Sequence, residues 1–265
     1  MILDPAAQLP RPSPPLLLLH GFTGSGLNWE GHHRAFKQHF YTFTVDLLGH
    51  GDSESPADPE RYRIELIARD LMDVIDVFVF PRINLLGYSM GGRLALYMAL
   101  TYPERINRLI LESASPGLRT AAEREARIAQ DEALAQRIET EGVEAFADYW
   151  TTLPLFATQT PEVRERLKRQ RLRNNPVGLA NSLRGMGTGA QPSLWDRLGE
   201  LEMPTLLICG ALDTKFSAIN AEMHRLIPNS TLVVVPAAGH TTHVEQPERF
   251  RSEVLRFLGE NPRKR

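Results

Sequence analysis

The chain has 265 residues, with 30 basic and 32 acidic side chains and a formal net charge of −2. Hydrophobic residues make up 42% and charged residues 23%, which excludes a disordered chain, a collagen-like repeat and a basic nucleic-acid-binding protein. The length fits one large α/β domain or two small ones. The single cysteine, Cys209, excludes an internal disulfide and a cysteine-rich zinc site.

The N-terminal region lacks the pattern of a targeting segment. Prolines stand at positions 5, 10, 12, 14 and 15, and the apolar run that follows them is limited to the leucines at 16–19. A signal peptide needs a basic start and roughly 7–15 apolar residues, and a membrane-spanning helix needs about 20. We therefore expect a soluble, cytoplasmic protein in a reducing compartment.

Short apolar runs alternate with helical patterns along the chain. The runs are rich in Leu, Ile and Val without polar alternation, which is typical of strands buried on both faces of a parallel sheet. They cover residues 16–20, 41–46, 83–87, 108–113, 205–210 and 231–236. Apolar residues recur at helical spacing over 64–78 and 250–258. The alternation predicts a doubly wound, mostly parallel α/β sheet.

One long segment interrupts this alternation. Between residues 113 and 205 no strand pattern occurs, whereas residues 120–141 and 161–174 read as charged helices. Residues 175–192 are rich in Gly, Asn and Ser. We expect a single domain over residues 1–265, with a helical insertion at about 115–200 that forms a lid and is called the lid segment below.

The sharpest motif is Gly87-Tyr88-Ser89-Met90-Gly91, which follows a predicted strand and precedes a helical run. This is the G-x-S-x-G nucleophile elbow in the strand–turn–helix context that it requires. The serine must stand in a strained turn that lifts its hydroxyl out of the sheet, and side chains at 87 or 91 would collide there. The sequence therefore predicts Ser89 as the nucleophile of a catalytic site.

A serine needs a base that is oriented by an acid, and in this fold the chain order is Ser, acid, His. Asp213 follows the predicted strand at 205–210, and His240 follows the strand at 231–236. Both lie just past strand ends, where open α/β sheets bind ligands. His243 is a competing base, but it falls at the start of the last helix. We predict the triad Ser89, Asp213 and His240.

The backbone N–H groups of Met90 and Phe22 are the expected oxyanion hole. Phe22 belongs to the loop His20-Gly21-Phe22-Thr23-Gly24, directly after the first strand. The later glycine-rich turn around His50 reads as architecture, without a catalytic role.

Several cations lie near this site by chain position. Arg93 is one helical turn after Ser89, where it opposes the helix dipole, and it fits either an ion pair with a neighbouring segment or contact with an anionic substrate. Lys215 follows Asp213 by two residues. The lid segment adds Arg127 and Arg171, which spacing alone would place at the surface.

These motifs resemble the α/β-hydrolase superfamily over nearly the whole chain. Within it, several lid-segment sequences resemble the family of 2-succinyl-6-hydroxy-2,4-cyclohexadiene-1-carboxylate synthases, which act in menaquinone and phylloquinone biosynthesis. The sequences are Ser-Ala-Ser-Pro-Gly-Leu at 113–118, Phe-Ala-Asp-Tyr-Trp at 146–150, Leu-Pro-Leu-Phe at 153–156 and Asn-Ser-Leu-Arg-Gly-Met-Gly-Thr-Gly-Ala-Gln-Pro at 181–192.

The resemblance implies a lyase that needs no cofactor or metal. In that family an enolpyruvyl-cyclohexene tricarboxylate loses pyruvate by proton abstraction and elimination, which here would assign proton abstraction to Ser89, activated by His240 and Asp213. Its substrate-binding positions correspond in this sequence to Tyr88, Arg93, Arg127, Trp150, Arg171 and Lys215. Arginine suits carboxylate binding through its bidentate fork. The implied partner is a small polycarboxylate, with no nucleic acid and no membrane.

Two other functions use the same residues. A carboxylesterase or C–C bond hydrolase would apply the triad through water, although an esterase for neutral esters has little use for three converging arginines. A non-catalytic small-molecule receptor can also retain an intact triad. Rapid turnover of short p-nitrophenyl esters without pyruvate release would favour the hydrolase over the lyase. A Ser89→Ala variant separates the receptor from both enzymes, because only a working triad loses turnover.

Overall fold

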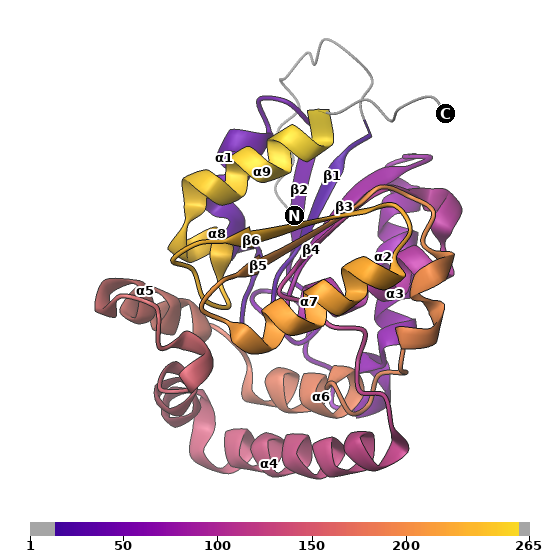
Figure 1. The fold of residues 1–265 in the computed structure, drawn as a ribbon. Helices are drawn as coiled ribbons and strands as arrows, with labels where there is room; N and C mark the ends of the chain where they lie inside the picture. The colour runs from indigo at the N-terminus through magenta and orange to yellow at the C-terminus, as the bar shows by residue number, and fades with distance from the viewer. Residues whose placement is uncertain (1–13, 260–265) are drawn as a thin grey trace.

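The computed structural model describes residues 14–259, and within them six parallel strands form one sheet in the order β2-β1-β3-β4-β5-β6 (Figure 1). All six predicted strands are present, with ends that differ by at most two residues from the predicted ones. Residues 1–13, which include most of the prolines behind the targeting expectation, lie outside the described range. The strands are β1 Leu16–Leu19, β2 Thr42–Val45, β3 Ile83–Tyr88, β4 Ile106–Glu112, β5 Thr205–Gly210 and β6 Ser230–Val235.

Each central strand buries alternate side chains in two different cores. Leu17 and Leu19 of β1 pack on one face of the sheet, and Leu16 and Leu18 pack on the other. The first face is covered by α2 Ile64–Val77, α3 Met90–Thr101 and α7 Thr214–Leu226, and the second by α1 Glu30–Phe36 and α9 Pro247–Gly259 (Figure 1). Burial on both faces explains why these strands read as continuous apolar runs. Cys209 is one of these buried strand residues.

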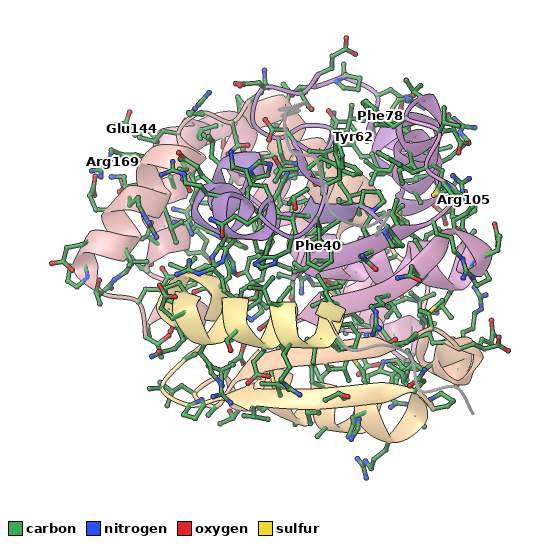
Figure 2. All side chains as sticks on the ribbon, turned by 90° about the horizontal axis from the view of Figure 1, so that it is seen from above. Phe40, Tyr62, Phe78, Arg105, Glu144 and Arg169 are labelled. Carbon is green, nitrogen blue, oxygen red and sulfur yellow. The ribbon has the colours of Figure 1, made fainter. Side chains whose placement is uncertain are left out.

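Between β4 and β5 the chain forms three α-helices, α4 Ala121–Thr151, α5 Pro161–Arg171 and α6 Pro176–Met186. A capping box between Thr120 and Glu123 starts α4, and Gly142 interrupts it with a φ of 83°. A third apolar core joins α4 to α6. These helices lie together below the sheet in Figure 1, while Glu144 of α4 and Arg169 of α5 extend from the surface in Figure 2.

The helix α6 lies in the stretch that composition described only as rich in Gly, Asn and Ser. The Asn175 side chain accepts hydrogen bonds from the N–H groups of Val177 and Gly178, and Pro176 occupies the first turn. This Asn-Pro pair is a helix start signal, and it outweighs the low helix propensity of the residues that follow.

Short elements complete the described chain. A four-residue helix, α8 Thr242–Glu245, precedes α9. Among the helices of residues 14–259, none combines the length and the apolar character needed to span a membrane. The 3-10 helices are η1 Gly26–Trp29, η2 Pro59–Tyr62, η3 Pro103–Arg105, η4 Pro154–Phe156 and η5 Trp195–Glu200.

The strand order places a crevice at the point where β1 lies between β2 and β3. The chain leaves β1 toward β2 on one side, whereas β3 pairs with β1 on the other, so the loops after β1 and β3 diverge. Ligands of open α/β sheets bind at such a switch point, outside the carboxyl ends of the strands. The loops after β1 and β3 carry the two motifs that the sequence singled out, around Phe22 and Ser89.

Candidate active site

The elbow around Ser89 forms a tight strand-to-helix turn. Ser89 has a φ of 51° and a ψ of −109°, a conformation that non-glycine residues rarely adopt. A Cβ atom at Gly87 would lie 2.2 Å from the carbonyl oxygen of Gly91, and one at Gly91 would lie 2.4 Å from that of His20. The glycines are therefore required by close backbone approach. The missing side chains allow the backbones at 87 and 91 to approach each other and the end of β1. The sequence predicted a requirement for glycine only from the space around the serine.

The structure brings the three predicted triad residues together. His240 Nε2 lies 3.1 Å from Ser89 Oγ, and His240 Nδ1 lies 2.7 Å from Asp213 Oδ2. With the Nδ1 proton donated to the carboxylate, Nε2 is free to accept the serine proton. Burial would raise the pKa of Asp213, but the hydrogen bonds from His240 and from the Phe216 N–H outweigh it and hold this pKa below its usual value.

His243, the competing base, is bound elsewhere. Its Nδ1 lies 2.9 Å from both carboxylate oxygens of Glu112, and its ring stacks at 4.6 Å on Trp29. His243 and Glu112 are both buried. Because His243 is paired with a second carboxylate behind the elbow, the preference for His240 agrees with the geometry.

The histidines of the first two loops have backbone partners. His20 Nδ1 donates to the carbonyl of Gly21 at 2.8 Å, and its Nε2 accepts from the Leu47 N–H at 3.0 Å. Burial, together with the neighbouring His20, lowers the pKa of His50 to about 3. Both rings are therefore neutral spacers between loops, as expected for His50. The loop after β1 that they support passes close to the elbow, since a Cβ at Gly21 would lie 3.4 Å from Ser89 Cβ.

A cavity of about 240 Å³ opens beside Ser89 and His240. Its lining includes the predicted oxyanion-hole residues Phe22 and Met90 and four of the predicted substrate-binding residues, Arg93, Arg127, Trp150 and Lys215. The cavity lies between the carboxyl ends of the strands and the helices α4 and α6.

The cations of this cavity differ in their partners. Arg127 Nε donates to Asp131 at 2.8 Å, which neutralises it. Arg93 is buried, and its guanidinium donates to the neutral side-chain oxygen of Gln191. Burial and repulsion by Arg127 lower the pKa of Arg93 to about 10. Over residues 14–259, neither Arg93 nor Lys215 makes an ion pair. Arg93 is therefore a buried cation with no ion-pair partner among residues 14–259 next to the serine, whereas Lys215 is exposed to solvent and its charge helps to lower the pKa of Asp213.

Comparison with known proteins places this arrangement in a family. The α/β-hydrolase fold family matches residues 14–247. A Bacillus subtilis (strain 168) protein named "Putative 2-succinyl-6-hydroxy-2,4-cyclohexadiene-1-carboxylate synthase" is 47% identical, over 94% of this chain and 92% of its own length. The chain belongs to the 2-succinyl-6-hydroxy-2,4-cyclohexadiene-1-carboxylate synthase family of α/β hydrolases.

Two further relatives agree with this family. The Serratia proteamaculans (strain 568) 2-succinyl-6-hydroxy-2,4-cyclohexadiene-1-carboxylate synthase is 32% identical over 92% of this chain and 93% of its own. The solved structure of MenH from S. aureus superposes with a TM-score of 0.90 at 37% identity, covering 95% of this chain and 96% of the other. The family expected from the lid-segment sequences is therefore confirmed.

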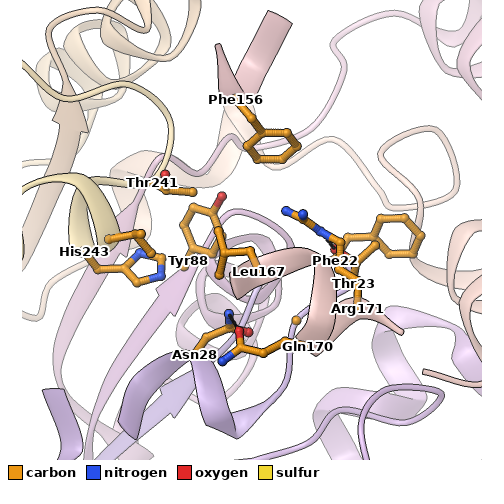
Figure 3. A pocket seen from close by; sticks show the side chains of 13 residues that line it. Phe22, Thr23, Asn28, Tyr88, Phe156, Leu167, Gln170, Arg171, Thr241 and His243 are labelled. Carbon is orange, nitrogen blue, oxygen red and sulfur yellow. Dashed lines mark hydrogen bonds between the residues drawn. The ribbon is translucent and has the colours of Figure 1, made fainter. Parts of the chain in front are cut away.

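Two of the predicted substrate-binding residues, Tyr88 and Arg171, line a separate small cavity (Figure 3). Tyr88 precedes Ser89, so the two side chains leave the backbone on opposite sides. Phe22 is the residue that lines both cavities. The two predicted residues thus lie beside the serine cavity and not within it.

Arg171 is a buried cation in this second cavity, contrary to the surface position that spacing favoured. Its Nε lies 3.2 Å from Thr23 Oγ1 and its guanidinium faces the Phe156 ring, while Nη1 has no hydrogen-bond partner within residues 14–259. Burial lowers the pKa of Arg171 to about 10, although the nearby Tyr88 opposes this shift. Burial and the charge of Glu112 raise the pKa of Tyr88 well above its usual value.

Sequence reasoning missed two groups that hold the site residues. Gln191 contacts Arg93, and Glu112 contacts His243. Gln191 lay within a sequence that carried the family resemblance, but no local pattern indicated its partner. Glu112 is an acidic residue directly after the apolar run Leu109–Leu111 of β4, and its position was a usable signal because a buried carboxylate requires a partner.

Proposed function

We propose that this chain is a carbon–oxygen lyase that releases pyruvate from 2-succinyl-5-enolpyruvyl-6-hydroxy-3-cyclohexene-1-carboxylate and forms 2-succinyl-6-hydroxy-2,4-cyclohexadiene-1-carboxylate. The names of its relatives support this reaction. The observation that carries it here is the buried Arg93, whose guanidinium bonds to a neutral oxygen and makes no ion pair within residues 14–259, in the cavity beside Ser89 and His240. A tricarboxylate substrate supplies the counter-charge that the protein lacks, whereas a neutral ester does not.

In the proposed step, Ser89 Oγ takes a proton from the substrate carbon as its own hydroxyl proton passes to His240 Nε2. The proton leaves ring carbon C2, and the released electron pair forms the C2=C3 double bond. The existing C3=C4 double bond shifts to C4=C5, and the bond from C5 to the enolpyruvyl oxygen breaks. The departing enolpyruvate takes up a proton and becomes pyruvate. Asp213 stabilises the imidazolium that forms, since its carboxylate accepts the Nδ1 proton at 2.7 Å.

The remaining roles follow from position. We assign the backbone N–H groups of Met90 and Phe22 to the negative charge that develops on the substrate, because both residues line the cavity and Met90 begins α3. Arg93, Arg127 and Lys215 are assigned to substrate carboxylates. Tyr88, Trp150 and Arg171 are assigned to pocket positions at the edges of the site.

The architecture and setting complete the proposal. Residues 1–265 form one domain, in which the lid segment, at about 115–200, covers the site. The chain acts in the cytoplasm on a small-molecule substrate, without nucleic acid.

The test is pyruvate release by the purified protein, followed with lactate dehydrogenase and NADH. The wild type is expected to turn over the enolpyruvyl substrate, and Ser89→Ala to lose at least about 10³-fold in kcat. Ser252→Ala, at an exposed position on α9, is the matched control. Rapid hydrolysis of p-nitrophenyl esters without pyruvate release would replace the lyase with an esterase.

A further inference from the structure

The loop that carries His240 is held by a carboxylate on its own side. Glu245 accepts hydrogen bonds from the N–H of Gly239 at 2.8 Å, from the N–H of Thr241 at 3.1 Å and from Thr241 Oγ1 at 2.7 Å. The residues directly before and after His240 are thus bound to one side chain. These hydrogen bonds fix the conformation of the loop, but they do not fix its position relative to the sheet.

A second carboxylate, from another part of the fold, binds the next two residues of the loop. Glu112 ends β4 and is fully buried. It accepts from Thr242 Oγ1 at 2.5 Å, from the His243 N–H at 2.9 Å and from His243 Nδ1 at 2.9 Å. Burial alone would raise the pKa of Glu112, but the charge of His243 and these hydrogen bonds lower it below its usual value.

The backbone of Glu112 contacts the other half of the site. Its carbonyl oxygen accepts a hydrogen bond from the Ser89 N–H at 2.9 Å, next to the register in which Tyr88 pairs with Glu112. One residue therefore binds the nucleophile through its main chain and the loop of the base through its side chain. It does not line the cavity beside Ser89.

We propose that Glu112 is a positioning residue, which sets the separation of Ser89 Oγ and His240 Nε2. That separation is 3.1 Å, and proton transfer depends steeply on it, because misplacement by about 1 Å costs on the order of 10²-fold in rate. The strained elbow that carries Ser89 and the loop that carries His240 come from distant parts of the chain. A residue that is bound to both can fix their relative position. The inference rests on the proposed roles of Ser89 and His240, but it holds whatever substrate they use.

The test compares Glu112→Gln and Thr242→Val with Thr205→Val. Thr242→Val removes one donor to Glu112 without changing side-chain shape. Thr205 is also a fully buried threonine, but its hydroxyl bonds to Met203 at the start of β5, away from the site. The readouts are kcat and KM for pyruvate release, the rate at which a fluorophosphonate modifies Ser89, and the unfolding temperature.

Glu112→Gln is expected to lower kcat by about 10–100-fold with KM within about twofold, the range typical of groups that orient a functional residue. Thr242→Val is expected to lower kcat by about 3–10-fold and the labelling rate in parallel. Thr205→Val should lower only the unfolding temperature.

Unchanged kcat and labelling in folded Thr242→Val would overturn the inference, and this variant decides the matter if Glu112→Gln does not fold. If the wild type releases no pyruvate, the proposed function fails, while the labelling rates still test the positioning role.

Discussion

Gln191, the neutral partner of Arg93, can be replaced by a carboxylate that competes with the substrate for the Arg93 guanidinium. The Gln191 side chain is buried and accepts a hydrogen bond from the Arg93 guanidinium. Gln191→Glu keeps the size and shape of this acceptor but adds a negative charge. Arg93 would then have an internal counter-ion, and a substrate carboxylate would have to displace it.

The magnitude follows from the kind of bond that is strengthened. The bond from the charged Arg93 to Gln191 already belongs to the class that contributes about 1.5–3 kcal/mol. An anionic acceptor adds a Coulomb attraction of about 1 kcal/mol at 4 Å in water and about 4 kcal/mol at an effective dielectric constant of 20, and desolvation of the new carboxylate offsets part of it. At about 1.4 kcal/mol per factor of ten, displacing the new ion pair should raise KM by about 10-fold and at most about 100-fold. The expected kcat stays within a few-fold, because Gln191 does not contact Ser89 or His240.

The assay is the substrate dependence of pyruvate release, with KM and kcat determined separately. Gln136→Glu adds the same charge at an exposed position on α4 and serves as the control. An unchanged KM in Gln191→Glu would refute the reasoning, since it would mean that Arg93 binds no substrate carboxylate. A large loss of kcat at constant KM would refute it as well.

Two further predictions concern stability in urea unfolding. Val79 follows α2 at a φ of 56°, and 84% of its surface is exposed. Replacing it by glycine relieves a left-handed strain of about 1–2 kcal/mol but increases the conformational freedom of the unfolded chain. Val79→Gly should therefore stabilise the fold by about 1 kcal/mol. Burial lowers the pKa of His32 and of His50 to about 3, so between pH 6.5 and 3 the unfolded chain binds protons that the folded chain does not. Stability should fall by about 2 kcal/mol for each of these two histidines from pH 7 to pH 5, and His50→Gln should remove the part that His50 contributes.

Each of these predictions has a matched control. Val77→Gly, also exposed but with helical geometry at the end of α2, should destabilise by up to about 1 kcal/mol, and equal effects at 77 and 79 would contradict the strain argument. His39→Gln at an exposed position controls for the histidine substitution itself. A stability that is flat between pH 7 and pH 5 would contradict burial of neutral His32 and His50.

The fold and the meeting of Ser89, Asp213 and His240 could be predicted because their signals are local. Burial on both faces of the sheet makes β5 an unbroken apolar run, and its predicted and observed bounds coincide. The G-x-S-x-G turn and the strand ends before Asp213 and His240 place three residues at one edge without knowledge of any contact. Parallel strands align those ends, so chain order was sufficient.

The supporting contacts could not be predicted because they join distant segments. Arg93 and Gln191 are 98 residues apart, and Glu112 and His243 are 131 apart. Arg171 lies on a helix whose charged sequence indicates exposure, yet packing against Thr23 and Phe156 buries its side chain. Such partners depend on how distant segments pack against one another, which neither periodicity nor composition encodes.

The two buried arginines also link ligand binding to the conformational stability of the whole chain. Arg93 and Arg171 lose hydration on folding without gaining a carboxylate from residues 14–259, and the lowered pKa of each reflects that loss. These two desolvated cations therefore weaken the folded state, and an anionic ligand that binds only this state stabilises it by mass action. Selection for heat resistance alone would favour apolar replacements at both positions, and with them a more stable protein that has lost two buried cations for an anionic ligand.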